Sequence, residues 1–334
     1  MSEQDRSQQL HRELTREVSS AGCFRIAPVR SVAFGAFILS SYAAAYAALL
    51  AAPAPTFRLL LLAALAFLNV QAGFLAHEAG HGALTRNRRI SHWVGQVFNT
   101  LLTALCHAHF SDIHRRHHPY CNDWTRDPDM QSEFFSMHPE SARRKTGLGG
   151  YISRHQAALI WILVWLQGFT LKLDSFGHLR RNLRATRTDQ GMLALHFALW
   201  IVPPIAFLGI MDAALNYLLM TLLIGPYLAV IFLVNHIGTR VMDPVTPPGF
   251  FLHEIAVTRN LGTSRLHDFL FGGVNNHIEH HLFPSMPTAR LRTARRITRE
   301  FCRRNRIEYR EMSWFEAARQ VTHHLRAMAA YVPP

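Results

Sequence analysis

Three clusters of histidines stand out in this chain of 334 residues because their spacing suits one face of a helix. The clusters are His77-Glu-Ala-Gly-His81, His114-Arg-Arg-His117-His118 and His277-Ile-Glu-His280-His281. Residues three or four positions apart are neighbours on a helix surface, so each cluster can present its imidazoles in one direction. Imidazole is the commonest side-chain metal ligand, and it binds zinc, copper, iron and nickel. Eight imidazoles are too many for one four-coordinate structural zinc and suit a site for two metals.

The first cluster also matches the motif HExxH, in which two histidines bind zinc and the glutamate is the general base of a metalloprotease. A zinc-dependent membrane metalloprotease is therefore an alternative function. It would use His77, Glu78 and His81, and it leaves the six histidines of the other clusters without a role. The sequence therefore favours a shared centre to which all three clusters contribute.

Four apolar segments are long enough to cross a membrane, and they are expected to form two helical hairpins. The segments cover residues 31–52, 59–76, 192–211 and 213–234. The turn Pro53–Pro55 joins the first pair, and Asp212 separates the second pair. Two shorter apolar stretches, 93–106 and 156–171, are better explained as interfacial or re-entrant helices, because a span needs about 20 residues. With these four spans, none lies between the first and second histidine clusters and two lie between the second and third. All three clusters are therefore expected on the same side of the membrane.

Arginine marks which side that is, because cytoplasmic loops carry an excess of basic residues. Arginines are frequent in residues 77–190 and 235–334 and scarce in the two turns on the opposite side. Both termini and the histidine clusters should therefore face the cytoplasm. We predict an all-α integral membrane protein with four transmembrane helices in two hairpins. Interfacial helices and a cytoplasmic helical cap, made of those two arginine-rich segments, would hold the histidine site.

The N-terminal residues 1–30 are expected to form a cytoplasmic amphipathic segment ahead of a single membrane domain, residues 31–334. Leu10, Leu14 and Val18 recur every four residues in a charged frame, which predicts a helix lying on the membrane surface.

The net charge of +13 is explained most simply by this positive-inside bias and by attraction to an anionic leaflet. A second explanation is docking of an acidic redox protein or an acidic acyl carrier. No separate basic domain is present in the sequence, so nucleic acid binding is not expected. The four cysteines form no CxxC pair, which favours a reduced, cytosol-facing state over a disulfide framework.

The three clusters on a four-span framework resemble the integral-membrane fatty acid desaturase and hydroxylase superfamily. The context of the third cluster, Gly272 to Pro284, and Thr258-Arg-Asn260 before it resemble the acyl desaturase branch without a fused cytochrome. The resemblance implies a non-haem centre of two iron ions held by the clustered histidines, with O2 as co-substrate. It also implies a ninth histidine between the last span and the third cluster, and His236 fits that position.

The resemblance further implies an O2-dependent membrane acyl desaturase that introduces a double bond into an acyl chain. A hydroxylase, ketolase or acetylenase of the same di-iron superfamily is the alternative. The sequence has no HPGG haem motif, no ferredoxin-like cysteine set and no GxGxxG on a strand, so we expect electrons from a separate ferredoxin or small cytochrome. The substrate would be a membrane lipid, an acyl-CoA or an acyl carrier protein. We expect a bacterial inner membrane, and we predict no catalytic residue beyond the iron ligands.

A histidine that binds a metal usually donates its other N–H to a carboxylate or a carbonyl, which orients the ring. Five polar residues near the clusters are candidates for this role: Glu78, Asp112, Asn235, Asp268 and Glu279. Four other histidines, His107, His109, His196 and His253, have no comparable position and are expected to be structural or exposed.

Overall fold

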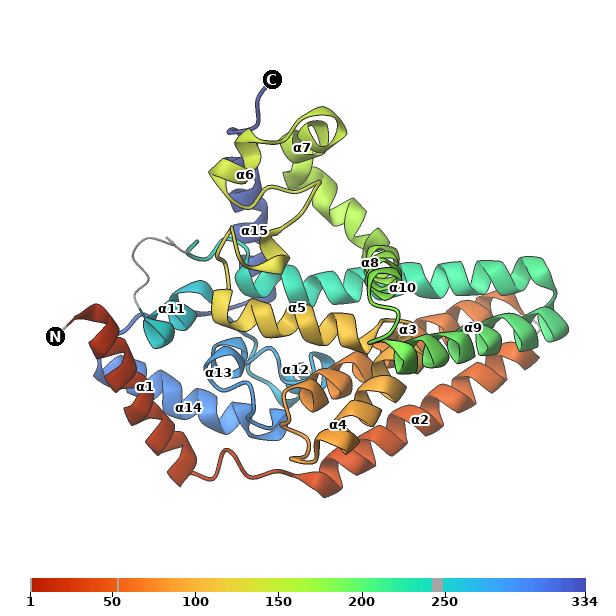
Figure 1. Cartoon of the computed structure of the whole chain (residues 1–334), viewed down its shortest axis with the longest axis horizontal. Helices are drawn as coiled ribbons and strands as arrows, with labels where there is room; N and C mark the ends of the chain where they lie inside the picture. Colours follow the sequence, from red (N-terminus) through yellow and green to blue (C-terminus); the bar gives the residue numbers. More distant parts are fainter. Residues whose placement is uncertain (1, 53, 242–248) are drawn as a thin grey trace. The chain divides into compact units, whose positions relative to one another are not determined.

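The computed structural model describes residues 2–52, 54–241 and 249–334, and the chain is mostly helical (Figure 1). Pro53 of the predicted turn and residues 242–248 of the predicted cap lie outside the described residues. The chain divides into two compact units. The hairpin unit consists of Ile26–Asp112 and Val164–Ala229. The histidine unit consists of Met1–Arg25, Ile113–Leu163 and Val230–Pro334.

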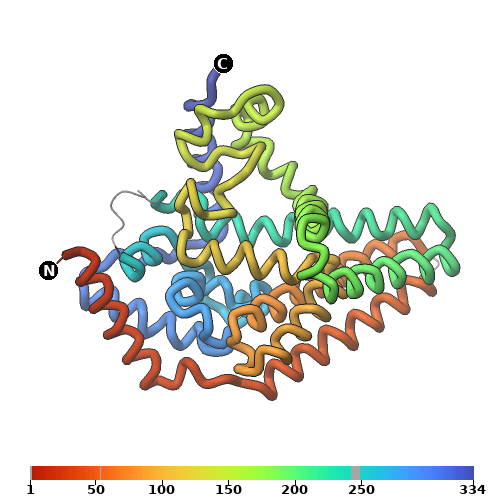
Figure 2. The backbone as a smooth tube through the Cα atoms, viewed as in Figure 1, coloured from red at the N-terminus to blue at the C-terminus, as the bar shows by residue number. Residues whose placement is uncertain are grey.

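Long apolar helices dominate the hairpin unit, and they form where the hydropathy of the sequence predicts them (Figure 2). They are α2 (Pro28–Ala51), α3 (Pro55–Gly80), α9 (Arg187–Leu208) and the first part of α10 (Ile210–His236). The second hairpin turns at Gly209, three residues before the predicted break at Asp212. Gly209 has φ +83°, a backbone conformation that favours glycine, whereas Asp212 lies in the first turn of α10 and forms an ion pair with Arg58. The carboxylate stays inside the helix because acidic groups are stable near a helix N-terminus.

A further long helical segment was predicted to be too short to cross a membrane. It consists of α7 (Gly147–Leu163), a 3₁₀ turn η3 (Val164–Leu166) and α8 (Gln167–Arg181), which together cover 35 residues. By length and composition it is one of five candidate spans among the described residues. The prediction underestimated its length because the helix extends through the charged residue Arg154.

The other short apolar stretch forms α4 (Arg88–Gly95) and a π-helical turn η1 (Gln96–Leu101), and neither is long enough to span. The chain then enters α5 (His107–Tyr120), which carries the second histidine cluster. Asp189, buried near the start of α9, accepts hydrogen bonds from the backbone N–H of Ala108 at 3.1 Å and from Gln96 Nε2 at 2.9 Å. This carboxylate therefore fixes the first turn of α5 to η1 and α9 within the hairpin unit.

Glycines allow α8 and α10 to approach closely in the hairpin unit. A Cβ atom added to Gly168 of α8 would lie 2.4 Å from the backbone oxygen of Thr221, and one added to Gly225 of α10 would lie 2.3 Å from the oxygen of Val164. Real Cβ atoms do not come this near to backbone oxygens, so both positions require glycine for this helix spacing.

Replacing Gly168 by alanine should therefore destabilise the protein, because the backbone of α10 cannot yield without moving the helix. Overpacking of this kind costs about 1–3 kcal/mol, and the thermal unfolding midpoint of the purified protein measures it. Gly191→Ala is the matched control, since a Cβ at Gly191 of α9 meets no atom within 4 Å. Equal midpoints for the two variants would contradict the close packing.

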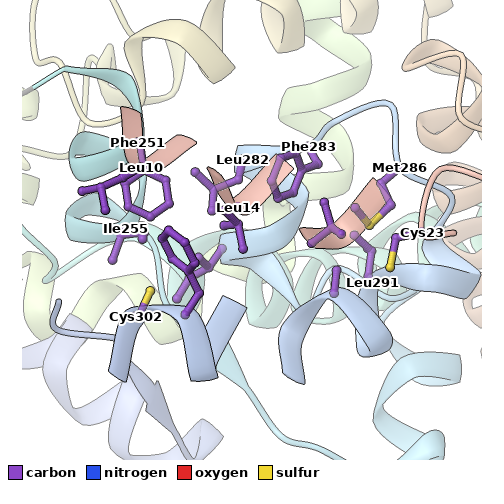
Figure 3. Packing of buried hydrophobic residues seen from close by; sticks show 14 residues of the cluster. Leu10, Leu14, Cys23, Phe251, Ile255, Leu282, Phe283, Met286, Leu291 and Cys302 are labelled. Carbon is purple, nitrogen blue, oxygen red and sulfur yellow. The ribbon is translucent and has the colours of Figure 1, made fainter. Parts of the chain in front are cut away.

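In the histidine unit, the core forms where α1 (Glu3–Ser20), α11 (Phe250–Val257), α13 (His277–Leu282) and α14 (Thr288–Arg304) meet. Leu10, Leu14 and Val18 of α1 form one face, as predicted, and all three are buried. Figure 3 shows Leu14 among the apolar side chains of this core, near Leu282 and Phe283. The apolar face of α1 therefore packs on protein, which corrects the expectation that it lies on the membrane surface.

The histidine unit also contains several shorter elements and the C-terminal helix. It contains η2 (Pro128–Met130), α6 (Pro139–Arg143), α12 (Arg265–Leu270) and α15 (Trp314–Ala329). A two-residue parallel pair, β1 (Asn260–Leu261) with β2 (Glu311–Met312), is a small exception to the all-α prediction. On α15, the oxygen of Leu325 accepts a 2.9 Å hydrogen bond from Gln156 Nε2 of α7, which places α7 against α15 within this unit.

Candidate metal centre

The second histidine cluster lies on the last turns of α5, with its imidazoles separated from its arginines. His117 and His118 are buried, whereas Arg115 and Arg116 between the histidines are exposed. This division follows from the helix period, because positions i, i+3 and i+4 share one face and the two residues between them point elsewhere.

The third cluster forms nearly all of the short helix α13, whose six residues are all buried. Ile278 and Leu282, four positions apart, belong to the apolar core with α1 and α14. The three histidines take other faces of the helix. Burial of the apolar pair against the core therefore holds the imidazoles of α13 in a fixed direction.

Seven of the nine predicted ligands come together in the histidine unit, and they form two groups. In the first group, the donor atoms of His114, His118 and His280 lie within 4.8 Å of one another. His114 and His118 approach most closely, at 3.0 Å between their Nε2 atoms.

The second group consists of His117, His236 and His281, whose donor atoms also lie within 4.8 Å of one another. His277 joins it, because its Nε2 atom is 2.6 Å from Nε2 of His236. His236 ends α10 in this unit, so the histidine that the resemblance indicated as the ninth ligand lies among the clustered ones. The Sγ atom of Cys121 is near as well, but burial raises the pKa of its thiol well above the usual range, which disfavours the thiolate that binds metals.

In the second group, every histidine has its Nδ1 atom engaged by an oxygen, which leaves Nε2 for a ligand. The four contacts are His117 to Asp127 Oδ1 at 3.0 Å, His281 to Glu254 Oε2 at 2.9 Å, His277 to the oxygen of Val274 at 3.1 Å and His236 to the oxygen of Val257 at 3.3 Å. Such contacts fix the orientation of metal-binding histidines. The Nε2 atom of His281 is buried and has no hydrogen-bond partner in the described part of the chain. This arrangement fits a bound transition metal.

The protonation states agree with this fit, because a metal binds only the neutral imidazole. Burial, with a smaller contribution from His117, lowers the pKa of His277 to about 3. Burial and the neighbouring His118 lower the pKa of His281 well below its usual range. For His117, burial acts in the same direction, but the carboxylates of Asp129 and Asp127 outweigh it and raise the pKa. A metal at His117 would therefore displace a proton.

The first cluster lies in the hairpin unit, at the C-terminal end of α3. His77 and His81 are close to each other there, with ring centroids 4.7 Å apart. Glu78 is buried next to them. The spacing i, i+4 thus pairs these two imidazoles as the sequence predicts.

Three carboxylates that contact the clustered histidines, Asp127, Asp129 and Glu254, were not among the candidates chosen from the sequence. Of those candidates, Glu279 bonds to Asn260 and Tyr309, and Asp268 bonds to asparagines and to Arg292. Asn235 donates to the backbone oxygen of Ile231, and Asp112 belongs to the hairpin unit. Asp127 lies only ten residues after His117, so its closeness in the sequence could have placed it among the candidates. No local signal marks Glu254.

Comparison with known proteins identifies the family. The sequence model of the family named Fatty acid desaturase matches residues 51–313. The chain belongs to the fatty acid desaturase family. Its apolar helices make it an integral membrane member of that family. The matched segment includes all three histidine clusters and His236.

Several curated proteins are similar to this desaturase-family chain. A Delta(8)-fatty-acid desaturase of Borago officinalis is 25% identical over 262 residues, which is 74% of this chain and 59% of that protein. The Delta(6)-fatty-acid desaturase fat-3 of Caenorhabditis elegans is 24% identical over 284 residues, 78% of this chain and 62% of that protein. The Delta(5) fatty acid desaturase fat-4 of the same organism is 26% identical over 260 residues, 73% and 58%. The match thus spans about three fifths of each relative's length.

Proposed function

We propose that this protein is an O2-dependent membrane acyl desaturase that uses two iron ions. The observation that carries the proposal is the pair of histidine groups in the histidine unit, in which every histidine of the second group has its Nδ1 atom engaged by an oxygen. Membership of the fatty acid desaturase family supports iron over zinc as the metal.

The proposed iron ligands are the two histidines of α3 and the seven of the histidine unit. They are His77, His81, His114, His117, His118, His236, His277, His280 and His281. Bound iron would supply the oxygen chemistry that removes hydrogen from an unactivated methylene. The protein's own residues have three tasks: Asp127, Glu254 and two backbone oxygens orient the imidazoles, the apolar core holds α13, and burial excludes water.

The overall reaction balances with an external donor. The acyl chain loses two hydrogen atoms as a carbon–carbon double bond forms, and a donor provides two electrons. Together with two protons, these reduce O2 to two waters. A ferredoxin or a small cytochrome would be the donor, and a membrane lipid, an acyl-CoA or an acyl carrier protein would present the chain.

The position of the double bond is not carried over from the relatives, because their names give three different positions. We further propose the four-span topology, with both termini and the histidines at the cytoplasmic face of a bacterial inner membrane. The excess of arginine in residues 77–190 and 235–334 supports that orientation. The hydrogen bond of α7 to α15 supports keeping α7 outside the spans.

Lipid analysis of a host that expresses the chain is the decisive test. A desaturase should produce acyl chains lighter by one H2, and the fragmentation pattern should give the position of the double bond. Acyl chains heavier by one oxygen atom would instead indicate a hydroxylase on the same histidine framework. Metal analysis separates the metalloprotease alternative: about two irons per chain supports the proposal, whereas one zinc without iron would contradict it.

A further inference from the structure

A buried asparagine follows the second histidine cluster and connects two segments of the histidine unit. Asn122 lies just after α5, its side chain is buried, and its φ is +58°. This left-handed conformation is uncommon outside glycine, and asparagine is one of the few other residues that adopt it readily. After this turn, the side-chain amide of Asn122 contacts the end of α10, the helix that carries His236.

The backbone of Asn122 is held by the same carboxylate that contacts His117. Oδ2 of Asp127 accepts a hydrogen bond from the backbone N–H of Asn122 at 2.8 Å, and Oδ1 lies 3.0 Å from Nδ1 of His117. Asp127 is almost completely buried, so both contacts are shielded from water. The positions of Asn122 and His117 are therefore set by one carboxylate.

The side chain of Asn122 lies against the C-terminal end of α10, where a helix leaves backbone carbonyls without partners inside the helix. Its Nδ2 atom donates to Thr239 Oγ1 at 2.8 Å, and it lies 3.2 Å from the backbone oxygen of Arg240 and 3.3 Å from that of His236. An amide has two N–H groups, so these three acceptors share them. Asn122 therefore binds the backbone of His236 and the turn that follows it.

Thr239 extends this contact to the imidazole of His236. The hydroxyl of Thr239 lies 2.6 Å from the backbone oxygen of His236 and 2.8 Å from that of Val257, and its single proton is donated to one of them. The oxygen of Val257 is also the group that contacts Nδ1 of His236 at 3.3 Å. Asn122 and Thr239 together thus hold the backbone of His236 and the carbonyl that orients its ring.

We propose that Asn122 is a positioning residue that fixes His236 relative to His117. The two histidines belong to different helices, α10 and α5, so their spacing depends on a connection between these helices. Asn122 provides it, because its backbone is bound to the carboxylate that holds His117 and its amide to the end of α10. That the two histidines bind iron rests on the proposed function. The connection itself does not depend on which metal is bound.

Binding of cobalt(II) by the full-length purified protein tests the proposal without turnover, because imidazole binds divalent transition metals in general. In Asn122→Gly the amide is lost, and glycine keeps the left-handed backbone without strain. We expect the cobalt affinity to fall by about tenfold or more, which is the usual cost of losing a residue that orients metal ligands. Titration against a competing chelator measures the affinity.

Asn305→Gly is the matched control for this variant. Asn305 lies in the same unit, and its Nδ2 atom donates to the backbone oxygen of Phe301 near the end of α14, at 2.9 Å. Both variants lose an amide that binds a carbonyl at a helix end, and both gain the flexibility of glycine in the unfolded chain. We therefore expect both to lower the thermal unfolding midpoint of the metal-free protein, and only Asn122→Gly to lower cobalt affinity.

Thr239→Val is a milder second variant, which keeps the test available if Asn122→Gly does not fold. Valine keeps the shape of the side chain and removes the hydroxyl, and cobalt affinity should fall by about two- to tenfold, the range for one hydrogen bond. Since both residues are proposed to act through His236, the double variant should bind cobalt about as weakly as Asn122→Gly alone. A loss equal to the product of the two single losses would contradict this shared route.

Unchanged cobalt affinity in Asn122→Gly and Thr239→Val would overturn the proposal. Equal losses of affinity in Asn122→Gly and Asn305→Gly would overturn it as well, because a general loosening of the unit would then suffice. Failure of the proposed function gives a different result. A wild-type protein that forms no desaturated product, or that contains one zinc and no iron, would refute that function, and the ranking of the variants in cobalt affinity would still decide the role of Asn122.

Discussion

Replacing His281 by alanine should abolish product formation and lower the iron content of the purified protein. His281 lies at the centre of the second histidine group, with ring centroids 4.4 Å from His118, 5.1 Å from His117 and 4.8 Å from His236. Its buried Nε2 atom is held toward these rings by the bond from Nδ1 to Glu254. Because His281 is a proposed iron ligand, its loss should exceed the roughly 10- to 100-fold cost of losing a residue that orients a ligand.

Mass analysis of lipids and metal analysis of the same preparation measure this effect. His323→Ala is the matched control, because His323 is exposed on α15 and belongs to neither histidine group. His281→Gln tests whether the loss arises from a cavity, since glutamine fills much of the volume and cannot replace the imidazole nitrogen. A His281→Ala protein with unchanged product and iron would refute the proposed centre.

The helical period explains why the histidine clusters could be found from the sequence. On α13, the spacing of His277, His280 and His281 already separates them from Ile278 and Leu282, and the structure shows the latter two in the apolar core. The choice of faces is a local property of the helix. The same reasoning predicted which face of α1 is apolar and buried. It did not predict that protein covers this face, because an apolar stripe can be covered by lipid or by protein.

The residues that orient the histidines could not be found in this way. Glu254 precedes His281 by 27 residues, and the contact between them arises from the packing of α11 against α13. Proximity in the sequence instead favoured Glu279, which is directly beside His280 but points to Asn260 and Tyr309. Neighbouring residues on a helix face different directions, so adjacency to a ligand is a weak guide to contact with it.

The boundaries of the apolar helices show a related limit. The sequence placed the turn of the second hairpin at Asp212 because of its charge, whereas the chain turns at Gly209, where a positive φ is needed. The charge of Asp212 is balanced by Arg58, a partner 154 residues away. Hydropathy therefore locates such helices well, but their ends depend on backbone conformation and on distant ion pairs.

Glu254→Gln should weaken iron binding by about 10- to 100-fold while the protein remains folded. The substitution preserves the size of the side chain and removes the negative charge that faces Nδ1 of His281, at 2.9 Å. Both side chains are completely buried, so no water replaces the lost partner. Burial raises the pKa of Glu254 well above its usual range, and a positive metal bound to His281 would favour the ionised carboxylate. Titration with a chelator, followed by metal analysis, measures the affinity.

Glu279→Gln is the matched control, because Glu279 is an equally buried glutamate on the helix that carries the third cluster. Its carboxylate accepts hydrogen bonds from Asn260 Nδ2 at 2.8 Å and from the hydroxyl of Tyr309 at 2.7 Å. We therefore expect Glu279→Gln to lower the thermal unfolding midpoint and to leave iron affinity nearly unchanged. Equal losses of iron affinity in the two variants, at equal midpoints, would show that burial of a carboxylate near α13 matters and that the specific contact with His281 does not. If Glu279→Gln lost more iron affinity than Glu254→Gln, then Glu279, the neighbour of His280 in the sequence, would be the residue that orients a histidine.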